Sequence, residues 1–355
     1  MRKWLLYIIC IGVLVASCSN LDEGIPGTPA DTDKVNVTFT LAIGNQTGYT
    51  PRTVAREIIQ QQGDDYENLI MNTNNGGFQV VAYSLENDRY LGEVSNLKII
   101  RNWDTESGHV YEFIGELKDV VEMSLNCKFM VFANCSGQVS VDTNLSQFTY
   151  EYLPDHFKDQ KQGIPMWGVK KITTTLIPGK RTDLGTIYLL RAMAKVEVKM
   201  ADEAYTFTKV HINSYYKEGY CLPEYYSSID DSEYYKMNGE SAYNPYLQGQ
   251  TISSGTDFFK TADNTYILYI PEYNRDDQQQ LLINVEISKE GKPVELENPI
   301  IYFKDYNTDT EFNVIRNHYY SFNVSVREDL SGNIKTDIQS SIDPWTTVEV
   351  SSDYE

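Results

Sequence analysis

Residues Val35-Asn-Val-Thr-Phe-Thr-Leu-Ala-Ile43 alternate between apolar and polar side chains. The large apolar residues all fall on odd positions, namely Val35, Val37, Phe39, Leu41 and Ile43. Successive side chains of a β-strand point to opposite faces, so this period of two predicts a strand with one buried face. We expect the strand to end at Gly44.

Other short apolar runs follow along the chain, separated by connections that are rich in turn residues. They lie at 78–83, 97–100, 110–114, 128–133, 172–177, 185–190, 195–199, 265–270, 281–287, 300–303 and 319–326. These runs do not alternate with helical segments, which disfavours a parallel α/β sheet. We predict an all-β fold of two tandem antiparallel β-sandwiches, of the transthyretin-like or Greek-key type, with few short helices.

The chain has 355 residues, a length that predicts two domains. A turn at Pro178-Gly179, followed by a new apolar run, places the boundary near residue 182. We expect an N-terminal β-sandwich domain over 34–182 and a C-terminal β-sandwich domain over 183–355. Residues 213–265 are rich in Tyr, Ser and Asn and only weakly periodic, which predicts irregular loops.

The composition is strongly acidic, with 30 Lys and Arg against 50 Asp and Glu and a formal net charge of −20. This charge has the wrong sign for neutralising phosphates, so a nucleic-acid partner is excluded. The 27 Tyr residues suit a half-exposed β surface better than helical packing. The composition therefore indicates a β-rich protein with a solvated exterior.

The N-terminal residues have the pattern of a secretory signal. Arg2 and Lys3 precede an apolar run over 4–14, and the run ends in Leu14-Val-Ala-Ser-Cys18, which resembles a bacterial lipobox. The lipobox implies a signal peptide over 1–17 and a lipidated, palmitate-bearing Cys18, with residues 18–33 as a tether. An ordinary signal peptide or an uncleaved anchor is the alternative, and it leaves the placement of Cys18 unexplained.

The sequence shows no catalytic motif. His109, His156, His211 and His318 lie outside every metal or nucleophile pattern, and we assign no metal and no cofactor. The expected mature protein keeps Cys127, Cys135 and Cys221, an odd number that indicates buried structural cysteines and not a disulfide framework. We therefore do not expect an enzyme.

A group of aromatic residues offers a carbohydrate-stacking surface, with plain packing as the alternative. Its members are Trp103, Trp167, Tyr216, Tyr225, Tyr226, Tyr234 and Tyr235. Residues 345–355 form a last alternating segment, in which Val348, Val350 and Tyr354 share one face. A terminal strand of this kind either pairs within its own sheet or adds to the exposed edge of a neighbouring molecule.

Several segments, in this order along the chain, resemble the fimbrillin family, the subunits of type V fimbriae of Bacteroidales. They are the lipobox, the strand 35–43 followed by Arg52, and the segments 164–168, 190–198, 269–272, 314–320 and 344–345. Each segment is weak by itself, and their order is the specific part of the resemblance.

The resemblance implies a lipoprotein exported to the cell outer membrane and cut after an Arg by a trypsin-like protease. Arg52 is the expected site and Arg56 its competitor, and either is alternatively an ordinary solvated charge. The cut would release the first strand, and the terminal donor strand 345–355 of another subunit would take its place. The expected partners are other fimbrial subunits, the processing protease and, through Cys18 before processing, membrane lipid.

Two other functions stay open. An unprocessed fimbrial anchor would keep its first strand and its lipid, and a surface glycan-binding lipoprotein would use the Tyr-rich loops over 215–246. The choice between a shaft, tip or anchor role is not determined by the residues.

Overall fold

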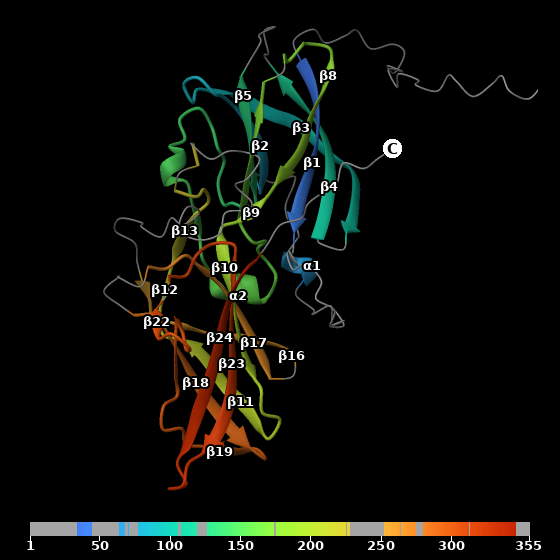
Figure 1. The fold of residues 1–355 in the computed structure, drawn as a ribbon. Helices are drawn as coiled ribbons and strands as arrows, with labels where there is room; N and C mark the ends of the chain where they lie inside the picture. The colour runs from blue at the N-terminus through green and yellow to red at the C-terminus, as the bar shows by residue number, and fades with distance from the viewer. Residues whose placement is uncertain are drawn as a thin grey trace, which may run out of the picture. The chain divides into compact units, whose positions relative to one another are not determined.

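The computed structural model describes residues 34–44, 64–67, 70, 77–105, 108–118, 126–173, 175–224, 226–227, 252–262, 264–274, 280–311 and 313–345. Strands account for most of these residues (Figure 1). The helices within the described ranges are short: α1 (Asp64–Glu67), α2 (Pro154–Lys158) and the 3-10 turn η1 (Leu145–Gln147). The prediction of an all-β fold with few short helices is confirmed.

The first sheet has the strand order β8-β1-β4-β3-β2-β5-β7-β9. Its strands are β1 (Lys34–Gly44), β2 (Phe78–Ser84), β3 (Tyr90–Thr105), β4 (Gly108–Lys118), β5 (Cys127–Ala133), β7 (Met166–Ile172), β8 (Arg181–Tyr188) and β9 (Leu190–Arg191). The sheet folds over, because β2 and β4, which β3 separates in this order, contact each other through their side chains. The ring of Phe78 on β2 stacks on Phe113 of β4 at 4.8 Å between centroids, which places the core between these two strands.

Two further sheets follow. One has the order β16-β17-β10-β23-β24, and the other has the order β15-β11-β18-β19 with β20 beside β18. The strands of the former are β10 (Met193–Met200), β16 (Phe259–Ala262), β17 (Thr265–Pro271), β23 (His318–Glu328) and β24 (Ile334–Pro344). Those of the latter are β11 (Tyr205–Ile212), β15 (Thr256–Asp257), β18 (Leu282–Lys289), β19 (Lys292–Val294) and β20 (Ile300–Tyr302).

Aromatic contacts join the two later sheets face to face. Phe207 of β11 meets Tyr266 of β17 edge to face at 5.8 Å, and Phe303, next to β20, meets Phe322 of β23 at 5.4 Å. Short ribbons complete the fold. They are β6 (Thr149–Glu151) with β13 (Glu218–Tyr220), β12 (Tyr215–Tyr216) with β14 (Ile252–Ser253), and β21 (Lys304–Asp305) with β22 (Thr310–Glu311).

Sheet membership changes later in the chain than residue 182, where the sequence pattern placed the boundary. β8 pairs with β1 and β9 pairs with β7, so residues up to Arg191 belong to the first sheet, and the next sheet begins with Met193. Two strand pairs, β1 with β8 and β10 with β23, are parallel, whereas the other described pairs are antiparallel. These parallel neighbours are far apart in sequence, so no local turn pattern marks them.

β24 is a strand that the sequence pattern did not predict. It lies at the edge of its sheet and pairs along its whole length with β23, from Ile334 opposite Glu328 to Pro344 opposite His318. Residues 334–343 of this strand are half-exposed or exposed, and Ile342 is 42% exposed. An edge strand of this kind needs no apolar alternation, because neither of its faces is deeply buried.

Candidate assembly site

β1 lies in the interior of the first sheet. It pairs antiparallel with β4 along its full length, from Lys34 opposite Lys118 to Gly44 opposite Gly108, and it pairs parallel with β8 on its other side. The hydrogen-bonding groups on both of its edges are therefore occupied. We call the place between β4 and β8 that residues 34–44 fill the β1 site. Without β1, two strand edges would face each other across an unfilled gap.

The inner side chains of β1 are fully buried. Val35, Val37, Leu41 and Ile43 are 0% exposed and Phe39 is 1% exposed. The ring of Phe39 stacks on Phe113 with 5.3 Å between centroids and 6° between planes. Burial of a large apolar side chain stabilises a fold by about 1.5–3 kcal/mol, so the five together contribute about 8–15 kcal/mol. That is as large as the whole net stability of a typical domain.

The outer face of β1 is only partly open to solvent. Thr38 is 5% exposed and Ala42 is 0% exposed. Ala42 lies opposite Val110 of β4 and Tyr188 of β8, and its carbonyl oxygen accepts a 3.0 Å hydrogen bond from the N–H of Leu189. The β1 site therefore requires small, uncharged residues at these two outward positions as well as apolar residues inward.

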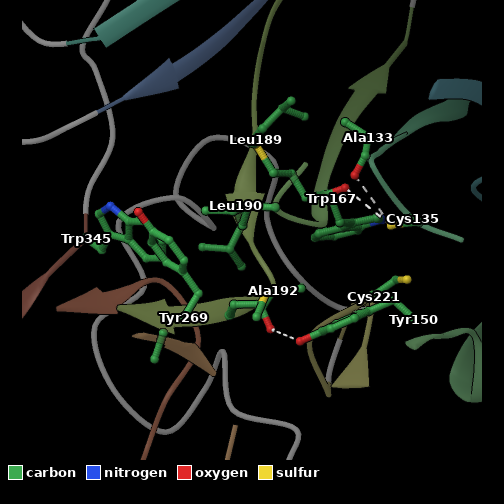
Figure 2. Close-up of a cluster of buried hydrophobic side chains, with 14 of the residues drawn as sticks. Ala133, Cys135, Tyr150, Trp167, Leu189, Leu190, Ala192, Cys221, Tyr269 and Trp345 are labelled. Atoms are coloured by element: carbon green, nitrogen blue, oxygen red, sulfur yellow. Dashed lines mark hydrogen bonds between the residues drawn. The ribbon is translucent and has the colours of Figure 1, made fainter. Parts of the chain in front are cut away.

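The chain end that the structure describes is held by a buried aromatic residue. Trp345 is 5% exposed, and its ring stacks on Tyr269 at 5.6 Å between centroids and 13° between planes. Figure 2 shows the two side chains beside each other. Its indole Nε1 donates a hydrogen bond of 3.0 Å to Oε2 of Glu67, and its backbone N–H donates one of 2.6 Å to the carbonyl oxygen of Asn317.

Glu67, the last residue of α1, is the centre of this group. Its Oε1 lies 2.7 Å from Nζ of Lys195 and accepts a 2.7 Å hydrogen bond from the hydroxyl of Tyr269. Burial, with the charge of Glu67 as a smaller cause, raises the pKa of Tyr269, so this hydroxyl keeps its proton and donates. Glu67 is 1% exposed, and its charge is compensated by Lys195 and by the hydrogen bonds.

Arg191 connects this group to β1. Its guanidinium lies 4.7 Å above the ring of Trp345, and its Nη1 donates a 3.1 Å hydrogen bond to the Trp345 carbonyl oxygen. Its Nε donates at 3.2 Å to the carbonyl oxygen of Glu67. Leu189, two positions before Arg191, donates its backbone N–H to the carbonyl oxygen of Ala42 in β1. The residues Glu67, Arg191, Lys195, Tyr269 and Trp345 form what we call the Glu67 cluster.

A second buried ion pair supports the same region. Arg316 is 0% exposed, and its Nε and Nη2 donate to the two carboxylate oxygens of Glu272 at 3.0 and 2.7 Å. Its Nη1 donates at 3.1 Å to the carbonyl oxygen of Cys221. Nδ1 of His318 lies 2.7 Å from the Arg316 carbonyl oxygen, and burial lowers the pKa of His318. This pair joins the segments 269–272 and 314–320 to the loop after β13.

The motifs that carry the sequence resemblance meet in space. Arg191 and Lys195 come from 190–198, Tyr269 and Glu272 from 269–272, and Trp345 ends the motif 344–345. Their shared role is to hold buried charges and one indole together. Glu67 was not predicted, because a single acidic residue after a polar stretch has no local pattern and shows its role only through partners distant in sequence.

The structure places one predicted functional segment and leaves the others outside the described residues. The first-strand residues Val35, Val37, Phe39, Leu41 and Ile43 fill the β1 site. The residues predicted for lipidation, processing and strand donation lie outside the described ranges. They are Cys18, Arg52, Arg56, Val348, Val350 and Tyr354.

The predicted carbohydrate surface is not formed by all of its members. Trp167 is 0% exposed, and Tyr216 is 8% exposed and stacks on Tyr273 at 4.8 Å. The prediction is wrong for these two residues, because their rings are buried inside the protein and are not available to a carbohydrate. Trp103 is half-buried, with the guanidinium of Arg101 5.8 Å from its ring. Tyr226 is half-buried too, and the other predicted residues, Tyr225, Tyr234 and Tyr235, lie outside the described ranges.

Cys127, Cys135 and Cys221 are buried free thiols, which confirms that they are structural. Burial raises the pKa of Cys127 to about 11. Among the residues that the structure describes, no group of three or more His, Cys, Asp or Glu side chains is arranged to hold a metal ion. Within the same ranges no helix is both long and apolar enough to cross a membrane.

The sequence matches no protein-family model and no curated protein. Among solved structures, the chain is similar to the tip fimbrial protein Mfa3 from Porphyromonas gingivalis, with a TM-score of 0.50 and 14% sequence identity, over 88% of this chain and 100% of that one. It also matches the fimbrilin FimA from Porphyromonas gingivalis with a TM-score of 0.45 and 13% identity, over 88% of this chain and 99% of that one. The first similarity shows a fimbrillin-like fold.

Proposed function

We propose that this chain is a structural subunit of cell-surface fimbriae that assembles by donor-strand exchange. The observation that carries the proposal is the position of β1 between β4 and β8, with all of its inner side chains buried. A strand in this position leaves a complete strand site behind when it is removed. The fimbrillin-like fold and the order of the sequence motifs support the same proposal.

In the proposed sequence of events, the chain is exported as a lipoprotein acylated at Cys18 and is then cut after Arg52 or Arg56. Both residues lie between β1 and α1, so the cut would separate β1 from the rest of the chain. α1 would stay with the body of the protein, because Glu67 is held by Lys195 and Trp345. The lipid would leave with the released segment.

The packing of β1 explains why release would have to be coupled to replacement. The inner side chains of the strand contribute about 8–15 kcal/mol, so a subunit with an open β1 site is expected to be unstable. Before the exchange, β1 itself covers the edges of β4 and β8, which protects the precursor from premature pairing. Trp345, the first residue of the predicted donor strand, stays in the Glu67 cluster. We propose that the rest of that strand, residues 346–355 of one subunit with Val348, Val350 and Tyr354 inward, takes the β1 site of a neighbouring subunit.

An unprocessed anchor that keeps β1 and its lipid is the alternative fimbrial role. The N-terminal residue of the protein shed from cells distinguishes these roles. Thr53 or Glu57 supports cutting after Arg52 or Arg56, whereas an acylated Cys18 as the sole N-terminus supports the anchor. Replacing both residues, Arg52→Ala with Arg56→Ala, should keep the protein lipid-bound and prevent its incorporation into fimbriae.

Deletion of residues 346–355 tests the donor role. The truncated chain keeps Trp345 and therefore the Glu67 cluster, so it is expected to fold with an unchanged thermal midpoint. Fimbria formation should be lost, whereas a glycan-binding lipoprotein would keep its binding. Filaments that still form from this variant in normal amounts would disprove the donor assignment.

A further inference from the structure

The β1 site has three requirements that a replacement strand must meet. Its five inward positions each hold a large apolar side chain, and the third of these is Phe39, whose ring lies 5.3 Å from that of Phe113. Phe113 also stacks on Phe78, with 4.8 Å between the ring centroids, so the middle of the site is built for an aromatic ring. Its outward positions at Thr38 and Ala42 are buried and exclude charges.

Residues 346–355 of this chain meet these requirements poorly. The sequence reads Thr-Thr-Val-Glu-Val-Ser-Ser-Asp-Tyr-Glu, and its apolar face consists of Val348, Val350 and Tyr354, interrupted by Ser352. Only three large apolar residues are available for five buried positions. Ser352 would leave a cavity wherever it replaced one of the inner side chains of β1.

The register that fills all five inward positions in the direction of β1 places Thr346 at Val35 and Tyr354 at Ile43. Val350 then replaces Phe39, and the stack on Phe113 is lost. In the same register Glu349 falls on Thr38, which is 5% exposed and pairs with Asp183, and Asp353 falls on Ala42, which is 0% exposed. The residues paired with these positions are Ile114 and Asp183 at Thr38 and Val110 and Tyr188 at Ala42, and none of them is a cation. Two carboxylates would thus enter buried positions beside strands that offer no opposite charge there.

Other registers exchange one mismatch for another. Placing Tyr354 over Phe113 puts Asp353 at the buried position of Thr38 in the direction of β1, and Glu355 at the same position in the reverse direction. Ser352 falls on an inward position in both directions. Reversing the strand with all inward positions filled moves Glu349 beside Glu112 and Asp353 beside Glu116 on β4. Like charges on directly neighbouring strands are destabilising, and Val350 again replaces Phe39.

We propose that the β1 site of this chain accepts a strand from a different subunit and discriminates against the C-terminal strand of a second copy. This inference rests on the proposed exchange of β1. The partner strand has large apolar residues on its inward face with an aromatic residue over Phe113, and small uncharged residues at the positions of Thr38 and Ala42. Because residues 346–355 of this chain do not fit its own β1 site, the chain joins unlike subunits and does not form a polymer of identical copies.

A peptide exchange experiment on the full chain tests this proposal. A specific protease sequence introduced at Arg52 allows the folded protein to be cut without other changes, and three labelled peptides are offered to it. One peptide has the sequence of residues 34–44, and one that of 346–355. The third carries Glu349→Thr, Val350→Phe, Ser352→Leu and Asp353→Ala in the 346–355 sequence. Native mass spectrometry measures incorporation and release of the original strand.

We expect the 34–44 peptide and the substituted peptide to be incorporated, and the native 346–355 peptide to be incorporated about 100-fold less well. Incorporation of the native 346–355 peptide equal to that of the 34–44 peptide would overturn the discrimination but leave strand exchange intact. If even the 34–44 peptide fails to exchange into the cut protein, the proposed function itself is wrong, and the inference with it. The two failures therefore give different results.

Discussion

The indole Nε1 of Trp345 donates a 3.0 Å hydrogen bond to the carboxylate of Glu67, 278 positions earlier in the chain. Glu67 ends the first helix after the predicted processing sites, and Trp345 is the first residue of the predicted donor strand 345–355. The helix that follows the predicted processing sites is thus bonded to the start of the predicted donor strand. Because neither partner of this bond belongs to β1, it gives the subunit a fixed point outside the strand that is expected to leave.

The charge of Glu67 should be essential to this fixed point. Glu67→Gln keeps the size of the side chain but leaves Lys195 buried without its ionic partner, and we expect a loss of about 3–5 kcal/mol in the free energy of unfolding. Urea denaturation followed by tryptophan fluorescence measures it. Asp159→Asn, which breaks an exposed pair with Lys161, is the matched control and should leave the midpoint unchanged. Equal midpoints for the two variants would contradict the role assigned to Glu67.

Phe39 should be the most sensitive position of β1. Phe39→Ala removes a fully buried ring from its stack on Phe113 and leaves a cavity, which is expected to cost about 3–5 kcal/mol in the free energy of unfolding. Asn36→Ala, on the half-exposed outer face, serves as control, with an expected change within about 0.5 kcal/mol. A small effect of Phe39→Ala in chemical denaturation would show that β1 does not hold the first sheet together.

The pair of Arg316 and Glu272 should behave as one unit. Arg316→Met leaves the Glu272 carboxylate buried without its partner, and Glu272→Leu does the same to the guanidinium, so each is expected to cost about 3–5 kcal/mol. The double variant should cost less than the sum of the two, with a coupling of about 0.5–3 kcal/mol. A double-mutant cycle in guanidinium chloride measures the coupling, and strict additivity would argue against a direct interaction.

His318 should make the stability depend on pH. Burial lowers its pKa in the folded state below the ordinary value of 6.5, despite the hydrogen bond to Arg316 and the nearby Glu272, which act in the opposite direction. The unfolded chain therefore binds more protons, and the free energy of unfolding is expected to fall as the pH drops below about 6.5. His318→Gln should show a smaller decrease between pH 7 and pH 5 in denaturant titrations. An identical pH profile for the two proteins would contradict this assignment.

Local patterns were sufficient for most of the strands. β1 has a strict alternation because one face meets the core, and the runs at 78–83 and 128–133 became the buried strands β2 and β5. β24 was missed because an exposed edge strand does not need apolar residues. The parallel pairing of β1 with β8 was also missed, since strands so far apart in sequence are joined by no recognisable turn.

The sequence by itself determined the all-β class, the buried face of residues 35–43 and the acidic character of the chain, because strand periodicity and charge are properties of neighbouring residues. The tertiary structure alone decided that β1 lies between β4 and β8, that Glu67 receives Lys195, Tyr269 and Trp345, and that Trp167 and Tyr216 are used in packing. Each of these depends on which distant segments meet. That choice is made by burial and pairing over the whole chain, and no short stretch of residues contains it.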